Sequence, residues 1–180
     1  PLRPIFVSTV DSGNFIAYLI VLKEGIKEYM HELENKEDAE KTIERIENII
    51  NNTNFKPLYD ESKDLFYIGY NVGEGKTLNN YYDLLASEAR ISSYIAISRR
   101  EVPVRNWERL GKSLVKENGS LSLASWSGTM FEYLMPSLVM KNYKNTLLDE
   151  TYRTTINVQK EYGKKNNVPW GISESGFFAF

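Results

Sequence analysis

The chain has 180 residues, of which 42% are hydrophobic and 26% charged, so it is long enough and apolar enough to bury a globular core. Its net charge of −2 gives no electrostatic case for nucleic-acid binding. It has no cysteine, and its one histidine, His31, lies beside a charge-rich segment, which excludes disulfides, thiol nucleophiles, histidine-based triads and zinc sites.

The ends and the hydropathy of the chain bear on its context. No signal peptide is visible, and no apolar run approaches the roughly 20 residues of a membrane span, so any membrane attachment is expected outside this segment. The chain starts at Pro1 without a methionine and stops inside the apolar run GFFAF, whereas termini are more often polar. We therefore expect a piece of a longer polypeptide.

The opening residues, PLRPIFVSTVDSGN, are predicted to be extended and then to turn into a helix over residues 12–30. Thr9 or Asp11 is the expected helix cap. Asp11 has two compatible roles, as the N-cap or as a ligand for a sugar hydroxyl at the head of the helix.

Two further elements are predicted before residue 80. Residues 38–50 carry one stripe of isoleucines on an otherwise charged or polar sequence, which predicts a helix packed on one side and solvated on the other. Residues 65–72 are rich in aromatic and β-branched residues and lie between turn signals. They predict a strand or short hairpin within residues 58–78.

Residues 81–97, YYDLLASEARISSYIAI, have the periodicity of a helix, with Asn79 as its cap. Glu88 is predicted to lie in the middle of the apolar stripe, while Arg90 points elsewhere. An ionised carboxylate is seldom buried without a partner, so Glu88 is either a core glutamate paired with an Arg or a Tyr, or a carboxylate in a lined cleft. The stripe consists of Leu84, Leu85, Ile91 and Ile95.

The second half of the chain also reads as mainly helical. Residues 104–110 predict a short helix closed by Gly111, and residues 121–126 an extended segment. Residues 130–140 are apolar apart from a few positions that include Glu132, and Pro136 is expected to kink or restart that helix. A last helix is predicted over residues 146–163. The recurring helices predict a mostly α fold of inner and outer helices in layers.

Three glutamates thus stand in apolar or aromatic surroundings: Glu88, Glu132 and Glu174, the last in the glycine-flanked loop PWGISESGF. Glycines there let the backbone approach a ligand, although Glu174 is equally an exposed loop acid. Chemistry that uses only carboxylates is glycoside cleavage or transfer, in which one carboxyl group donates a proton and the other attacks or activates water. No cofactor or metal is expected. The residues themselves indicate this reaction class and no substrate.

Six blocks give a more specific indication: VSTVDSGN, LYDESKDLFYIGYNV, YYDLLASEAR, SWSGTMFEYLMP, LLDETYR and VPWGISES. In this order, over essentially the whole chain, they resemble the glycoamylase-like domain of bacterial cyclic β-1,2-glucan synthases. The resemblance implies an (α/α)6 barrel, of which residues 1–180 would form the N-terminal half of a single domain. It also implies a retaining transglycosylase that closes linear β-1,2-glucan into a ring, and related domains are endo-β-1,2-glucanases.

The resemblance also implies site residues. Glu88 in LASEAR and Glu174 in GISES match the catalytic pair, with Glu174 assigned as acid/base and Glu88 as nucleophile. Around YYDLLASEAR and SWSGTMFEYLMP the sequence shows no departure from the family pattern that touches a carboxylate. Residues in matching blocks would line the sugar subsites: Asp11, Tyr82, Arg90, Trp126, Glu132 and Trp170.

The implied partners are β-1,2-glucan, the remaining half of the barrel, and flanking glycosyltransferase and phosphorylase-like domains. The family context implies a larger membrane protein with this soluble segment on the cytoplasmic side of the inner membrane. Two alternatives stay open: an endo-β-1,2-glucanase that releases linear oligosaccharides, and a non-catalytic glucan-binding or scaffolding module.

Overall fold

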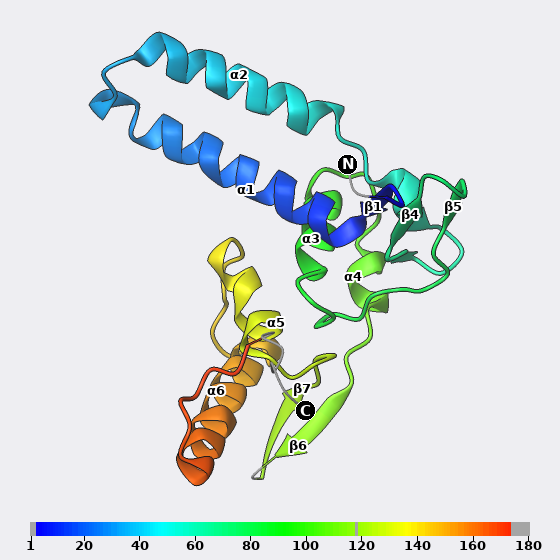
Figure 1. Cartoon of the computed structure of the whole chain (residues 1–180), viewed down its shortest axis with the longest axis vertical. Coiled ribbons are helices and arrows are strands. Elements are labelled where there is room, and N and C mark those ends of the chain that lie inside the picture. The colour runs from blue at the N-terminus through cyan, green and yellow to red at the C-terminus, as the bar shows by residue number, and fades with distance from the viewer. Residues whose placement is uncertain (1–2, 118, 174–180) are drawn as a thin grey trace. The chain divides into compact units, whose positions relative to one another are not determined.

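The computed structural model describes residues 3–117 and 119–173 (Figure 1). About half of the chain is helical, and its strands form small antiparallel sheets, which confirms the prediction of a mostly α protein. The chain divides into two compact units. The first comprises the described residues of Pro1–Tyr81 with Ile91–Arg109, and the second those of Tyr82–Arg90 with Leu110–Phe180.

The first unit contains a helical hairpin of α1 (Thr9–Glu28) and α2 (Lys36–Asn52), joined through the 3-10 turn η1 (Met30–Glu32) and lying side by side in Figure 1. The prediction that Thr9 or Asp11 caps α1 is wrong. Ser8 is the N-cap, and its side chain accepts a hydrogen bond from the Asp11 N–H. The helix therefore begins before Asp11, which lies exposed in its first turn.

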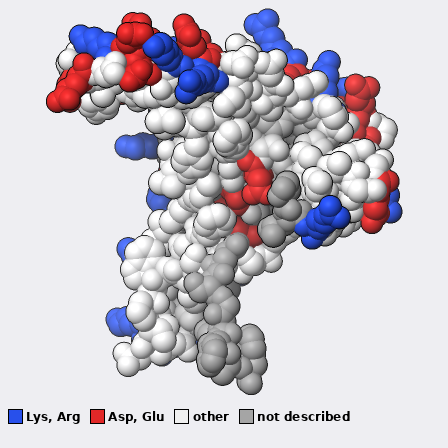
Figure 2. All heavy atoms as spheres, turned by 45° about the horizontal axis from the view of Figure 1, so that its top comes forward, with Lys and Arg blue, Asp and Glu red and all other residues white. Residues whose placement is uncertain are grey.

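The prediction for α2 is confirmed. Ala39 and Ile46 are buried, whereas the charged residues along the helix are largely exposed. Figure 2 shows basic and acidic side chains intermixed over this end of the unit. Lys23 and Lys27 of α1 both reach Glu47 of α2, at 3.5 and 3.6 Å, so ion pairs border the apolar seam of the hairpin.

The strands predicted within residues 58–78 are present but belong to two sheets. β2 (Tyr59–Asp60) pairs with β3 (Leu65–Phe66), and a second sheet has the order β1-β4-β5, with β1 (Phe6–Ser8), β4 (Gly69–Asn71) and β5 (Lys76–Thr77). The Tyr67 N–H bonds the Leu58 carbonyl and so continues the β2–β3 pairing, whereas the Ile68 N–H bonds the carbonyl of Asn80. The chain therefore leaves the first sheet at Ile68.

The helix predicted over residues 81–97 is shorter than expected, because α3 spans Arg90–Ser98. Tyr81 forms a β-bridge with Tyr67, so Asn79 caps no helix. Residues 84–89 form turns, and Ser87 has a positive φ of 48°. Burial of the four stripe residues is confirmed, although only Ile91 and Ile95 lie on α3. Arg90 does not point to solvent; it is the largest fully buried side chain among the described residues.

The short helix predicted before Gly111 is confirmed as α4 (Arg105–Arg109). In the second unit, β6 (Leu114–Glu117) and β7 (Ser120–Leu123) form a hairpin that packs on α6 (Leu147–Asn166). The Leu123 N–H donates to the buried Thr151 hydroxyl of α6 at 3.1 Å. A polar contact thus fixes the hairpin to the helix.

The predicted effect of Pro136 is confirmed: α5 (Met130–Leu134) gives way to the 3-10 turn η3 (Met135–Leu138), with the proline near its start. The predicted end of the last helix at Gly163 is wrong. The helix continues to Asn166 and is capped by Asn167 in the left-handed region, with φ 54°. Gly163 serves close packing instead, because a Cβ there would lie 2.8 Å from the Val168 carbonyl oxygen.

Within residues 3–117 and 119–173, no helix is both long and apolar enough to cross a membrane.

Gly13 on α1 marks a close approach to α3, and its substitution tests the packing of the first unit. A Cβ at Gly13 would lie 1.9 Å from the Ser92 hydroxyl oxygen and 2.6 Å from the Ser92 Cα. We expect Gly13→Ala to lower the free energy of unfolding by about 1–3 kcal/mol, because the helices must separate. Urea denaturation measures this change.

Gly25 on the same helix is the matched control, because a Cβ there meets nothing within 4 Å. Gly25→Ala should raise the free energy of unfolding by about 0.5–1 kcal/mol through helix propensity alone. Equal effects at the two glycines would contradict the close approach at Ser92.

Candidate active site

Glu88 lies in the turn that leads into α3, not within the helix, and its side chain is 7% exposed. The hydroxyl of Ser87 donates a hydrogen bond to Glu88 Oε2. The positive φ of Ser87 is a conformation that few non-glycine residues adopt and that occurs often at functional sites. A buried carboxylate is thus held in a defined orientation by its neighbour.

Glu132 lies in the first turn of α5, whose N-cap is Thr129, and is 3% exposed. Its Oε1 accepts the Ser87 N–H at 3.1 Å, and its Oε2 accepts the Ser127 N–H at 2.8 Å. Burial by itself would raise the pKa of Glu132, but the donors of Ser127, Ser125 and Ser87 outweigh it and hold that pKa below its usual value. Glu132 is therefore an ionised carboxylate inside the second unit.

Arg90, 1% exposed, donates from Nη1 to the Glu132 carbonyl at 3.1 Å and from Nη2 to the Tyr133 carbonyl at 2.8 Å. Nη2 also lies 3.2 Å from the Tyr152 hydroxyl. Burial lowers the pKa of Arg90, while Tyr152 and the charge of Glu88 oppose that shift. Arg90 thus binds the α5 backbone, and Glu132 of α5 in turn binds the backbone of the Glu88 turn.

Tyr82 and Trp126 form an aromatic platform. Their rings are stacked, with centroids 5.7 Å apart and planes inclined by 26°. Trp126 is 54% exposed, and its Nε1–H points to Asp83 Oδ2 at 3.5 Å. A solvent-facing aromatic surface with hydrogen-bonding groups at its edge is suited to the faces of sugar rings.

Gln159 of α6 anchors the segment that precedes Glu174 in sequence. Its Oε1 accepts the N–H groups of Gly171 at 3.2 Å and Ile172 at 2.8 Å, and its Nε2 donates to the Gly128 carbonyl at 3.1 Å. Trp170, at the start of that segment, is 49% exposed, and Lys160 Nζ lies 5.1 Å from the centre of its ring.

The second unit brings several predicted site residues into connected positions. Glu88, Arg90 and Glu132 share one network, and Tyr82 stacks on Trp126. Asp11 belongs to the first unit, and Glu174 lies outside the described residues. No group of three or more acidic or histidine side chains in the described ranges could hold a metal ion.

Several residues that hold these side chains were not predicted, among them Ser87, Ser127 and Gln159. Gln159 had a sequence signal, since it is a polar residue in register with the buried face of α6. Both serines donate their backbone N–H groups to Glu132, and the Ser87 hydroxyl also binds Glu88. The backbone contacts leave no signal in the residue type.

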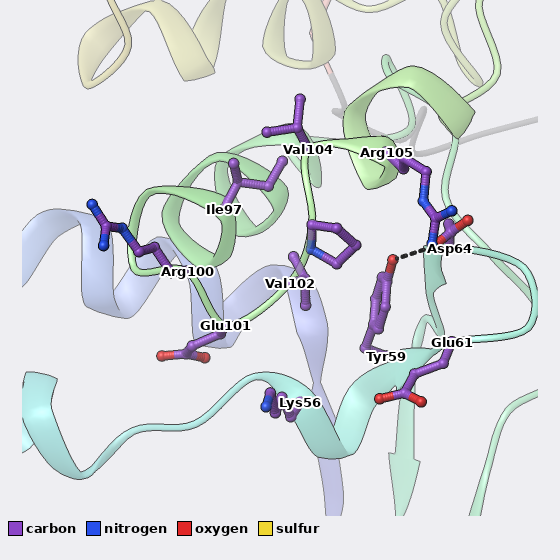
Figure 3. Close-up of a pocket in the computed structure, with 11 residues that line it drawn as sticks. Lys56, Tyr59, Glu61, Asp64, Ile97, Arg100, Glu101, Val102, Val104 and Arg105 are labelled. Atoms are coloured by element: carbon purple, nitrogen blue, oxygen red, sulfur yellow. Dashed lines mark hydrogen bonds and ion pairs between the residues drawn. The ribbon is translucent and has the colours of Figure 1, made fainter.

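The first unit holds a separate cavity of about 670 Å³ (Figure 3). Two of its three acidic groups are bound within the protein: Asp64 accepts from the Tyr59 hydroxyl at 3.0 Å and lies 3.3 Å from Arg105, while Glu101 pairs with Arg99. The third, Glu61, is exposed. Burial and then the bond to Asp64 raise the pKa of Tyr59 to about 12. We assign this cavity no chemistry.

Comparisons with known proteins agree with the resemblance noted in the sequence. The family model Glycoamylase, whose description is "Putative glucoamylase", matches residues 80–176. The cyclic beta-(1,2)-glucan synthase NdvB of Rhizobium meliloti (strain 1021) is 40% identical over 136 residues, which cover 76% of this chain and 5% of that protein. The chain therefore spans a small part of the length of this relative. On the match to the family model and the identity to this synthase, the chain belongs to the glycoamylase family.

Proposed function

We propose that this chain contributes the catalytic glutamates of a retaining transglycosylase that converts linear β-1,2-glucan into cyclic β-1,2-glucan. The best support is that the family match and the position of Glu88 agree. The chain is 40% identical to a cyclic glucan synthase over 136 residues. Within it, Glu88 is a buried carboxylate that binds the Ser87 hydroxyl, in the turn between Tyr82 and Arg90. Carboxylate-only chemistry of this kind is that of glycoside cleavage and transfer.

In this mechanism Glu88 attacks the anomeric carbon and forms a glycosyl ester, while Glu174 gives its proton to the departing glycosidic oxygen. The 2-hydroxyl at the other end of the same glucan chain then attacks the anomeric carbon of this ester. Glu174 accepts that proton, the new β-1,2 bond closes the ring, and the Glu88 carboxylate is released. Retention requires the two carboxyl groups to lie about 5–5.5 Å apart, whereas about 6.5–9.5 Å would indicate inversion through water.

The proposal extends to architecture. The helical hairpin of α1 and α2, with a charged outer helix, suits an inner and outer pair of an (α/α)6 barrel, of which this chain would form about half. The remaining half and flanking glycosyltransferase and phosphorylase-like domains are the proposed partners, in a larger protein of the inner membrane with this domain on its cytoplasmic side.

Product analysis tests the activity. The natural polypeptide that contains these residues is incubated with linear β-1,2-glucan, and the products are separated by mass and by the presence of a reducing end. Rings support the proposal. Short linear products would instead assign an endo-β-1,2-glucanase, and binding without any product would assign a glucan-binding module.

The aromatic platform yields a prediction about binding. Trp126→Ala removes the exposed indole ring that stacks on Tyr82, so the KM for linear glucan should rise roughly tenfold, the equivalent of about 1.4 kcal/mol of stacking. Steady-state kinetics measures the change. Tyr162→Ala, which removes another exposed aromatic from the second unit, is the control and should leave KM unchanged.

A further inference from the structure

The loop of residues 125–129, here called the bridging loop, is bonded to both segments that carry the predicted glutamates. Glu132 connects it to the Glu88 turn, because one carboxylate accepts the N–H of Ser127 from the loop and the N–H of Ser87 from the turn. Gln159 connects it to the segment before Glu174, because one amide binds the Gly128 carbonyl and the N–H groups of Gly171 and Ile172.

We propose that Glu132 and Gln159 are positioning residues, which hold the Glu88 turn and residues 171–172 in place through the bridging loop, and that Glu132 is not a ligand of the sugar. This inference rests on the proposed function and adds the means by which these two segments are held. Catalytic groups need placement to within a fraction of an ångström, and buried hydrogen bonds from the surrounding residues provide that precision.

The contacts of Glu132 favour this role over sugar binding. Both of its oxygens accept backbone N–H groups, the hydroxyls of Ser125 and Ser127 also donate to the carboxylate, and 3% of the residue is exposed. Together these donors use the roughly four acceptor sites of a carboxylate. A sugar hydroxyl would therefore have to displace one of them and leave a buried donor without an acceptor. The bond from Arg90 to the Glu132 carbonyl holds the same residue from its backbone side.

Gln159 suits its position because an amide both donates and accepts. Its Nε2–H bonds the carbonyl of Gly128, while its oxygen takes two N–H groups from the segment that leads towards Glu174. The Met130 N–H adds a bond to the Ile172 carbonyl at 2.8 Å, so α5 and α6 hold the same segment. No carboxylate could replace this amide without losing the donor.

The test compares variants of the natural polypeptide in the glucan assay. Glu132→Gln keeps one acceptor oxygen of two, and Gln159→Met removes all three bonds of the amide. Each should lower kcat at least tenfold while KM stays within threefold of the wild-type value. Gln159→Glu keeps the acceptor and loses the donor, so its kcat should lie between those of wild type and Gln159→Met. Glu150→Gln, an exposed position on α6, should behave as wild type.

Different outcomes separate the possible errors. A KM raised tenfold or more with kcat retained in Glu132→Gln would make Glu132 a sugar ligand and overturn the inference, as would unchanged kinetics in both variants. If Glu132→Gln does not fold, the kcat values of Gln159→Met and Gln159→Glu test the inference by themselves. Full activity of Glu88→Gln in the same assay marks failure of the proposed function itself. Faster hydrogen exchange at the Ser87 and Ser127 amides of Glu132→Gln would show that their bonds to Glu132 are weakened, independently of which reaction the protein catalyses.

Discussion

Glu88→Gln and Glu174→Gln are each expected to lower turnover of linear β-1,2-glucan by at least about 10³-fold, because each replaces a group that must gain a bond or a proton in the reaction. The amide has nearly the shape of the carboxylate, so the fold should be kept. Initial rates of product formation measure the loss. Full activity in either variant would refute the assignment of the pair.

A control and a rescue experiment separate the two roles. Glu61→Gln alters an exposed acid of the first unit and should keep wild-type turnover. In Glu88→Ala, added azide should attack in place of the nucleophile and give a glycosyl azide of inverted configuration. In Glu174→Ala, azide should attack the glycosyl-enzyme and give the retained configuration. The opposite pattern would exchange the roles of the two residues.

Arg90→Ala should lower the free energy of unfolding by about 3–5 kcal/mol. The substitution removes a fully buried guanidinium and leaves the carbonyls of Glu132 and Tyr133 without those donors in the protein interior. Urea denaturation followed by circular dichroism measures the change. Activity should fall with it, because the same contacts hold α5, which anchors the Glu88 turn.

Arg153→Ala is the matched control, since its guanidinium pairs with Asp149 and Glu150 on the exposed side of α6. Its effect should stay within about 0.5 kcal/mol, as is usual for surface ion pairs. Arg90→Lys should fall between the two alanine variants, because an ammonium cannot reproduce the planar fork that reaches both carbonyls. Equal decreases in the free energy of unfolding for Arg90→Ala and Arg153→Ala would show that the buried contacts of Arg90 do not stabilise the fold.

Much of the secondary structure follows from local sequence. The stripe of α2 and the cap residue Asn35 fix that helix, and Thr146 fixes the start of α6. Pro136 ends regular helix in the segment that begins at Met130, because it lacks the donor that a helix needs there. The family was also predicted from six sequence blocks, and the comparisons with known proteins confirm it. Buried carboxylates at Glu88 and Glu132 were expected from their apolar neighbours and are confirmed.

Only the tertiary structure decided the backbone around Glu88. Residues 81–89 have helical periodicity, yet two of their donors find distant partners: the Leu84 N–H bonds the Gly111 carbonyl, and the Ser87 N–H bonds Glu132. A helix would have used the Ser87 N–H internally, so these distant acceptors compete with it and turn the segment. Arg90 illustrates the same limit. Its burial depends on carbonyls some forty residues away, which no local pattern specifies.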